Sequence, residues 1–189
     1  REVTIGHLML DTNAKTRVLA KVNPPIRPRE DVEFLWQRLL EGKVDWVVSD
    51  HACCRREMKV ARNQLGNIWL AKSGFGGTEY LLPALVSEGM KRGLSLNKVS
   101  ELLSFNPAKR FGLNSKGDIA EGLDADLALV DPRETWTIRG QESESTQGYT
   151  PFEGIELSAR VKATFLRGAL ICENGNIVGK PRGKYLHRP

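Results

Sequence analysis

The sequence predicts an α/β chain in which a parallel layer of helices and strands is followed by a small antiparallel β unit. A proline-rich loop leads into an amphipathic helix after Pro28 and then into a short apolar run at residues 44–50. Loop, helix and buried strand in this order are typical of parallel sheets. From residue 116 on, several short strands follow one another, which predicts the β unit. We expect residues 1–113 to end a parallel α/β barrel or sheet and residues 114–189 to form the second part.

Composition limits the class of protein. The 189 residues are 40% hydrophobic and 27% charged, which is ordinary for a globular chain. The formal net charge is +5, but the basic residues are scattered among 23 acidic ones. Neither a recognition motif nor an aromatic platform accompanies them, so no nucleic-acid partner is expected. No run approaches the roughly 18 apolar residues of a membrane span, so no membrane partner is expected either.

The cysteines and the first residue indicate the setting of the chain. Three cysteines are an odd number, and Cys53 and Cys54 are neighbours, so a disulfide framework is not indicated. A reducing, cytoplasmic setting is therefore expected. The chain begins without methionine on the strand-like run EVTIGHLML, and we expect it to be a piece of a longer protein.

The first elements are read from apolar spacing. Residues Val3 to Leu10 predict a buried strand, and the three prolines of KVNPPIRPRED predict a rigid loop that holds Asn23 extended. A helix follows and ends at Gly42, and the run VDWVVSD predicts a short strand with both faces covered. The apolar face of the helix is formed by Val32, Leu35, Trp36, Leu39 and Leu40.

The middle of the chain predicts two further helices, and its end predicts strands. The glycines of SGFGGTE allow a close backbone approach before a helix with Pro83 near its start. Ser95 is expected to cap the next helix, after which NPAKRFGL turns the chain away. The segment from Gln141 to Gly148 predicts a polar linker, and Asn174-Gly175 predicts a two-residue hairpin. The expected strands lie in DADLALVD, TWTIRG, ARVKATFLRG and ALICENGNIVG.

The run VDWVVSDHACC carries a predicted strand directly into Asp50, His51 and two cysteines. Parallel α/β folds place catalytic and ligand groups at the carboxyl ends of their strands, so Asp50 is a candidate. The alternatives are that Asp50 caps the next segment and that His51 is an ordinary loop histidine. Because Cys53 and Cys54 are adjacent, they do not readily chelate one tetrahedral ion, and a structural zinc site is not favoured. The segment alone offers one hard oxygen ligand, too little to hold a divalent ion.

A longer set of motifs resembles the cyclic amidohydrolases, the family of dihydroorotase, hydantoinase (dihydropyrimidinase) and allantoinase. The first is KVNPPIRPREDVEFLWQRLLEGKVDWVVSDHACC, which is similar to the run through the last barrel strand of that family. The others follow in the same order along essentially the whole chain. They are GFGGTEYLLPAL, LSFNPAKRFGL, KGDIAEGLDADLALVDP, TPFEGIEL and VKATFLRG.

The resemblance implies the C-terminal part of a metal-dependent (β/α)8 TIM barrel with a small β-sandwich segment. It implies one or two zinc ions, most of whose ligands lie on barrel strands outside this chain. Asp50 matches the family's last metal ligand, which also takes a proton from the attacking water and passes it to the leaving nitrogen. Asn23, Ser73 and Gly74 match positions that contact a small cyclic amide or ureide substrate, and Cys54 matches a further substrate-contacting position.

The chain departs from the family pattern at two places, and the first of them narrows the substrate. Dihydroorotases read D-H-A-P-H where this chain reads DHACC, and a neutral thiol at Cys54 cannot replace an imidazole that faces a carboxylate. Dihydroorotase activity is therefore less expected than hydantoinase, dihydropyrimidinase or allantoinase activity. The start EVTIGHL matches the family's seventh-strand region with Ile5 and Gly6 replacing Pro-His, and His7 is expected to pack rather than catalyse.

The resemblance leaves two kinds of protein open. The first is a zinc-dependent cyclic amidohydrolase, of which this chain alone would be inactive. The second is a non-catalytic relative that keeps the hydrolase scaffold for assembly, and retention of Asp50 favours the first. In either case the resemblance implies a homo-oligomer, a dimer or a tetramer.

Overall fold

The computed structural model describes residues 1–60 and 66–187. The chain divides into two compact units, one made of Arg1–Ala84 and Thr137–Glu156, the other of Leu85–Trp136 and Leu157–Pro189. The division falls inside helix α4 (Thr78–Lys91). The predicted boundary after residue 113 lies within the second unit and stays a prediction.

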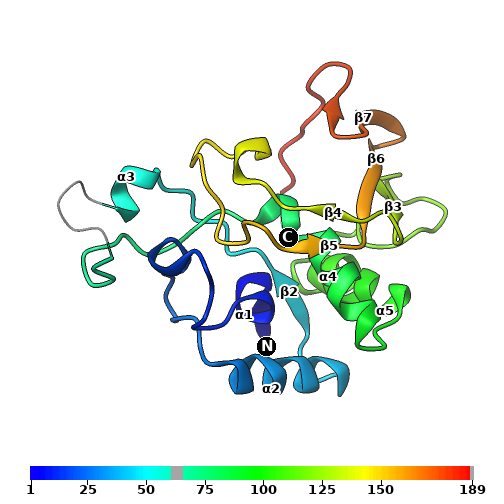
Figure 1. Ribbon diagram of the computed structural model, residues 1–189. Helices are drawn as coiled ribbons and strands as arrows, with labels where there is room; N and C mark the ends of the chain where they lie inside the picture. Colours follow the sequence, from blue (N-terminus) through cyan, green and yellow to red (C-terminus); the bar gives the residue numbers. More distant parts are fainter. Residues whose placement is uncertain (61–65, 188–189) are drawn as a thin grey trace. The chain divides into compact units, whose positions relative to one another are not determined.

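The first unit contains the parallel layer that the sequence predicts. Strands β1 (Glu2–Thr4) and β2 (Trp46–Val48) pair in parallel, with Val3 opposite Val47. Helix α2 (Arg29–Leu40) connects them and lies beside α1 (Ile5–Met9) (Figure 1). The Trp36 indole, 1% exposed, donates to the Leu8 carbonyl at 2.8 Å and fixes the two helices to each other.

The predicted strand from Val3 to Leu10 is wrong beyond Thr4, where α1 begins. The Thr4 hydroxyl accepts the His7 N–H at 3.2 Å and caps the helix, and the Leu10 N–H donates to the Gly6 carbonyl at 3.0 Å. A short apolar run fits both a buried strand and a buried helical turn, so its spacing does not separate them.

The predicted helix is confirmed as α2, and the predicted strand after it is present as β2. Val32, Trp36 and Leu39 are buried on one face of α2, but Leu40 is 44% exposed. In β2 only Val47 is buried, so the described residues cover one face of the strand rather than both.

The remaining parts of the first unit are loops with short helical turns. Helix α4 begins at Thr78, and the polar stretch expected before it includes residues 61–65, which lie outside the described residues. The segment from Gln141 to Gly148, predicted as a polar linker, belongs to the first unit and is mostly exposed, but its Gln147 is only 2% exposed. The short helical turns are η1 (Arg17–Ala20), α3 (Arg56–Lys59) and η3 (Gly140–Glu142).

The second unit begins with a broken helical stretch. Ser95 caps α5 (Leu96–Ser100) by accepting the Lys98 N–H at 3.2 Å, as predicted. Within NPAKRFGL the chain first stays helical, through the π-helical η2 (Glu101–Phe105) into α6 (Asn106–Arg110), and turns only at Phe111 and Gly112. Pro107 lies in the first turn of α6, directly after the π-helical turn.

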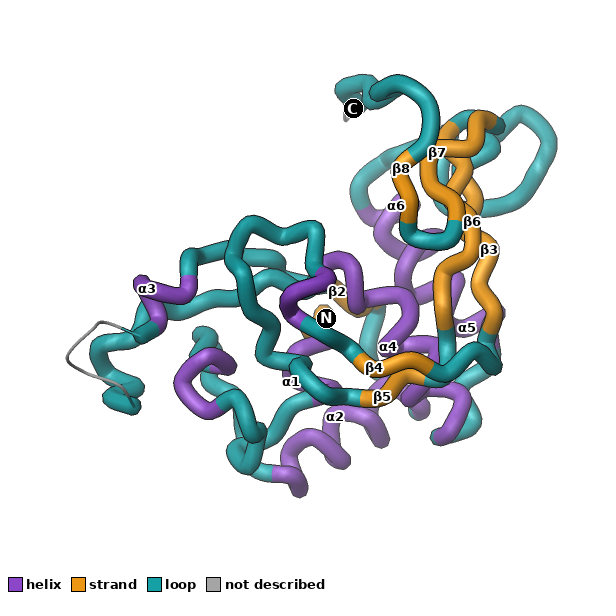
Figure 2. Tube along the Cα trace, turned by 45° about the horizontal axis from the view of Figure 1, so that its top comes forward, coloured by secondary structure: helices purple, strands orange, loops and turns teal. Residues whose placement is uncertain are grey.

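The second unit also contains a four-stranded antiparallel sheet of order β3-β6-β7-β8 (Figure 2). The Asn174-Gly175 hairpin joins β7 to β8 with φ of +48° and +82°, which confirms the predicted turn. The sheet strands are β3 (Leu127–Asp131), β6 (Arg160–Leu166), β7 (Ala169–Glu173) and β8 (Asn176–Ile177). Two further strands, β4 (Trp136–Thr137) and β5 (Glu156–Leu157), pair with each other.

Within residues 1–60 and 66–187, no helix has both the length and the apolar character that crossing a membrane requires.

Candidate active site

Asp50 stands two residues beyond the carboxyl end of β2, and its side chain is exposed. Its φ is +48°, in the left-handed region that aspartate tolerates better than most residues. The backbone therefore turns sharply directly after the strand. This turn places an exposed carboxylate at the end of a parallel strand, where the sequence predicts a catalytic group.

The neighbours of Asp50 are both tied to the N-terminus of α4. The Ser49 hydroxyl lies 3.1 Å from the Thr78 hydroxyl and accepts the His51 N–H at 3.3 Å. His51 Nδ1 accepts the N–H groups of Gly77 at 3.3 Å and Thr78 at 3.4 Å. Two donors require Nδ1 to be the unprotonated nitrogen, so the imidazole caps the helix. His51 is thus more than an ordinary loop residue, and Asp50 is held from both sides.

The loop before α4 is joined to the loop after β2. The Ala52 N–H donates to the Phe75 carbonyl at 3.0 Å, and the Gly74 N–H donates to the Lys21 carbonyl at 3.1 Å. Gly74 has a φ of +97°, and a Cβ there would lie 2.7 Å from the Ala52 Cβ. Only glycine fits both this backbone conformation and the space available. Gly74 and the half-buried Ser73 therefore lie close to the segment that carries Asp50.

Cys54 lies beneath this loop. Its buried thiol donates to the Gly74 carbonyl at 3.5 Å and lies 3.4 Å from the Tyr149 hydroxyl. Burial, together with the adjacent thiol, raises the pKa of Tyr149, so the phenol is neutral at ordinary pH. Two predicted substrate-contacting residues, Cys54 and Gly74, are therefore in direct contact with each other. Both backbone polar groups of Gly74 already have a partner within the chain.

Asn23, the remaining predicted substrate contact, is exposed in the proline-rich loop. Two residues before it, the Lys21 carbonyl accepts both the Gly74 N–H and the Lys59 ammonium, the latter at 2.6 Å. Lys59 is 2% exposed, and burial lowers its pKa from 10.5 to about 8. Sequence patterning does not single out this lysine, because the stretch from Cys54 to Lys72 is polar and irregular as a whole.

Gln147 contacts the loop before α4, which its sequence context did not predict. Its Oε1 accepts the Gly76 N–H at 2.7 Å, and its Nε2 donates to the Tyr149 carbonyl at 2.6 Å. The polar stretch around Gln147 predicted a linker, although the aromatic residues that follow it, Tyr149 and Phe152, indicate a packed segment. We call residues 49–54, 73–78 and 143–150 together the loop cluster.

The segment that contains Gln147 makes further polar contacts within the loop cluster. The Ser145 hydroxyl donates to the exposed Cys53 thiol at 3.5 Å, and the Thr146 hydroxyl lies 3.7 Å from it. These hydroxyls hold the pKa of the Cys53 thiol below its usual value. Glu79, in the first turn of α4, accepts the Glu144 N–H at 3.3 Å.

Metal ligation requires several suitable side chains in one place. Among the described residues, no group of three or more His, Cys, Asp or Glu side chains is placed to hold an ion. Asp50 fits the role of a single oxygen ligand, because its carboxylate is exposed just beyond the end of β2.

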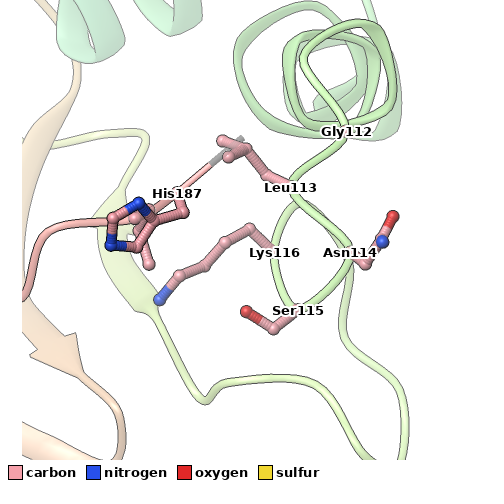
Figure 3. A pocket seen from close by; sticks show the side chains of 7 residues that line it. Gly112, Leu113, Asn114, Ser115, Lys116 and His187 are labelled. Atoms are coloured by element: carbon pink, nitrogen blue, oxygen red, sulfur yellow. The ribbon is translucent and has the colours of Figure 1, made fainter. Parts of the chain in front are cut away.

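The second unit carries a separate pocket of about 420 Å³ near the end of the chain (Figure 3). Its Lys116 forms ion pairs with Asp124, at 2.8 Å, and with Asp126, so the charge of the lysine is already compensated. None of the predicted site residues lines this pocket. The lining residues are Gly112, Leu113, Asn114, Ser115, Lys116, Leu186 and His187.

Comparisons with known proteins agree on one family. Residues 7–178 match the amidohydrolase family. An allantoinase from Rubrobacter xylanophilus is 41% identical over 187 residues, which cover 97% of this chain and 40% of that protein. An allantoinase from Salmonella newport is 36% identical over 185 residues, with 95% and 40% covered.

Solved structures give the same result. The L-hydantoinase (dihydropyrimidinase) from Arthrobacter aurescens superposes with a TM-score of 0.88 at 31% identity, covering 95% of this chain and 40% of that one. The dihydropyrimidinase from Brevibacillus agri has a TM-score of 0.84 at 31% identity, with 94% and 40% covered. The chain thus spans about 40% of the length of these relatives and has the fold of part of an amidohydrolase barrel protein. It belongs to the amidohydrolase family.

Proposed function

We propose that this chain is the C-terminal part of a metal-dependent hydrolase that opens the ring of a cyclic amide or ureide. The proposal is supported by the similarity to allantoinases and hydantoinases along nearly the whole chain. The single observation that carries it is the exposed Asp50 at the end of β2, with a left-handed backbone held by Ser49 and His51. If Asp50 served only as a cap, its carboxylate would accept the N–H groups at the start of α4. His51 accepts these N–H groups instead.

In this proposal Asp50 has two roles. As a ligand it binds one metal, which we propose to be zinc, while other segments of the full-length protein supply the remaining ligands. When bound, the metal lowers the pKa of water and polarises the scissile carbonyl. Asp50 accepts the proton of the attacking water and returns it to the leaving ring nitrogen. The contacts of Ser49 and His51 fix the backbone that carries this carboxylate.

The substrate contacts are proposed for one side of the ring. The exposed Asn23 amide can both donate and accept, as the edge of a ureide or imide requires. The backbone at Ser73 and Gly74 would lie along the same edge, and its position is fixed by the contact of Gly74 with Ala52. Cys54 would support this part of the substrate site from the buried side, because its buried thiol donates to the Gly74 carbonyl.

The buried thiol also favours a neutral ring over one that bears a carboxylate. A dihydroorotate carboxylate needs a cationic or strongly donating partner, and Cys54 offers neither from its position between Gly74 and Tyr149. We therefore propose hydantoinase-like, dihydropyrimidinase-like or allantoinase-like activity ahead of dihydroorotase activity.

The remaining features of the full-length protein are proposed on the family's pattern. Residues 114–189, which include the β3-β6-β7-β8 sheet, would contribute to a β-sandwich beside a barrel that ends at residue 113. The protein would be a cytoplasmic homo-oligomer, a dimer or a tetramer.

Metal analysis and an activity panel on the full-length protein test the proposal. The panel contains allantoin, hydantoin, dihydrouracil and dihydroorotate, each assayed with the purified metal-loaded protein. We expect metal to be retained and one of the first three rings to be opened, with dihydroorotate slower or inert. A metal-loaded, folded protein that opens none of the four rings would contradict the proposal and favour a non-catalytic assembly role.

A further inference from the structure

One buried side chain joins two parts of the loop cluster that lie far apart in the sequence. Gln147 is 2% exposed, and its Oε1 accepts the Gly76 N–H at 2.7 Å. Its Nε2 donates to the Tyr149 carbonyl at 2.6 Å. Both bonds are short, and each amide atom faces the partner that it requires, a donor for the oxygen and an acceptor for the nitrogen. If the amide were reversed, its NH₂ group would lie against the Gly76 N–H and its oxygen against the Tyr149 carbonyl. The two contacts therefore fix one orientation of the amide.

The space around Gly76 is closed from two sides. A Cβ at this position would lie 2.9 Å from His51 Cε1 and 3.0 Å from Gln147 Oε1. The imidazole of His51 follows Asp50 directly and caps α4, and the Gln147 amide enters from the returning segment. Gly76 is therefore packed between His51, which follows the proposed base Asp50, and Gln147, which has no role in the proposed chemistry.

The segment that carries Gln147 also supports Gly74, at the start of the loop before α4, through Tyr149. The Tyr149 hydroxyl lies 3.4 Å from the Cys54 thiol, which donates to the Gly74 carbonyl at 3.5 Å. Gln147 and Tyr149 together thus support the backbone from Gly74 to Gly76. Tyr149 acts through Cys54, whereas Gln147 bonds to the loop directly and more tightly.

We infer that Gln147 is a positioning residue of the active site, which holds the backbone of residues 73–76 in the geometry that contacts the ring. The inference rests on the proposed function for the identity of that ring. A buried amide that bonds to a backbone N–H removes the freedom of the loop before the substrate arrives. Without it, binding must order the loop, so affinity for the substrate falls more than the rate of the chemical step.

The test uses three variants of the full-length protein. Gln147→Met keeps the length of the side chain and removes both hydrogen bonds. Gln147→Glu keeps an acceptor for the Gly76 N–H. Gln141→Met makes the same chemical change at an exposed position of the same segment and serves as the matched control. Each variant is measured by kcat and KM on the ring that the unchanged protein opens, and by amide hydrogen exchange over residues 73–78.

For Gln147→Met we expect KM to rise about tenfold with a smaller change in kcat, and the Gly76 amide to exchange faster without substrate. Gln147→Glu should recover part of the amide protection and part of the KM, and Gln141→Met should leave both unchanged. The inference is overturned if Gln147→Met is folded with unchanged KM, or if Gly76 exchange does not change. If the unchanged protein opens no ring, the proposed function fails, and the exchange measurement alone decides whether Gln147 holds the loop.

Discussion

The loop cluster of the first unit and the four-stranded sheet of the second unit are held by different kinds of contact. In the loop cluster, single side chains bond to the backbone of distant segments, as Gln147 does to Gly76 and His51 does to Thr78. In the sheet, backbone ladders join strands that are neighbours in the order β3-β6-β7-β8. A ladder spreads its stability over many equivalent bonds. The loop cluster depends on a few side chains that have no substitute.

This difference separates activity from stability. A change in the loop cluster moves a backbone that is proposed to face the substrate, so its effect is expected on turnover and affinity. A change in the sheet is expected to alter the free energy of unfolding and leave turnover unchanged. The predictions below test this separation on the full-length protein, from the largest expected effect to the smallest.

The largest effect is expected for Asp50→Asn. The amide keeps the size of the side chain and tolerates the φ of +48°, but it cannot accept the proton of the attacking water. We expect kcat to fall by about 10³-fold or more, with the unfolding transition unchanged within about 0.5 kcal/mol. Steady-state kinetics and thermal unfolding measure the two quantities. Turnover equal to that of the unchanged protein would refute the proposed role of Asp50.

The next effect compares two glycines that share a left-handed backbone. Gly74→Ala places a Cβ 2.7 Å from the Ala52 Cβ at a φ of +97°, whereas Gly93→Ala at +85° meets nothing within 4 Å. We expect Gly74→Ala to lower the free energy of unfolding by about 3 kcal/mol and Gly93→Ala by about 1 kcal/mol. Only Gly74→Ala should also reduce kcat/KM. Equal effects of the two substitutions on activity would show that the loop cluster tolerates movement.

These contrasts also explain what the sequence could predict. The helix Arg29–Leu40 and the Asn174-Gly175 turn were predictable, because apolar spacing and turn chemistry are local signals. The position of Asp50 at a strand end was predictable for the same reason. The capping by His51 was not, because its partners Gly77 and Thr78 are brought to it only by the folded chain.

The contact of Gln147 was hidden for the same physical reason. Its partner Gly76 precedes it by 71 residues, and a polar stretch rich in serine predicts a linker when only its own composition is considered. The short helix Ile5–Met9 was missed for a different reason, because five residues are too few for apolar spacing to separate a helical turn from a strand.

A third prediction uses the buried Lys59. Its pKa is lowered from 10.5 to about 8, so the unfolded state binds more protons than the folded state between these values. Stability therefore rises as pH increases from about 8 to about 10.5, and the full cost of the buried charge applies below about 8. The shift corresponds to about 3 kcal/mol, and the hydrogen bond to the Lys21 carbonyl offsets about 1 kcal/mol of it.

Lys59→Met should accordingly raise the free energy of unfolding by about 2 kcal/mol at pH 7. The Lys21 carbonyl keeps the Gly74 N–H as a partner, so no buried acceptor is left without a bond. Denaturant unfolding at pH 7 and at pH 10 measures the change, and the gain should shrink at the higher pH. A gain that is the same at both pH values would mean that the lysine is not charged at a cost in the folded protein.

The smallest effect is expected in the sheet, for Gly175→Ala at the turn between β7 and β8. The added Cβ meets nothing within 4 Å, so the only cost is the left-handed φ of +82°. We expect the free energy of unfolding to fall by about 1 kcal/mol, because a non-glycine residue pays that much in this region. Activity should not change, since the neighbouring Cys172 and Ile177 remain paired through backbone bonds. A fall in kcat/KM with Gly175→Ala would show that a change in the sheet affects turnover. Stability and activity would then not be separated between the two regions.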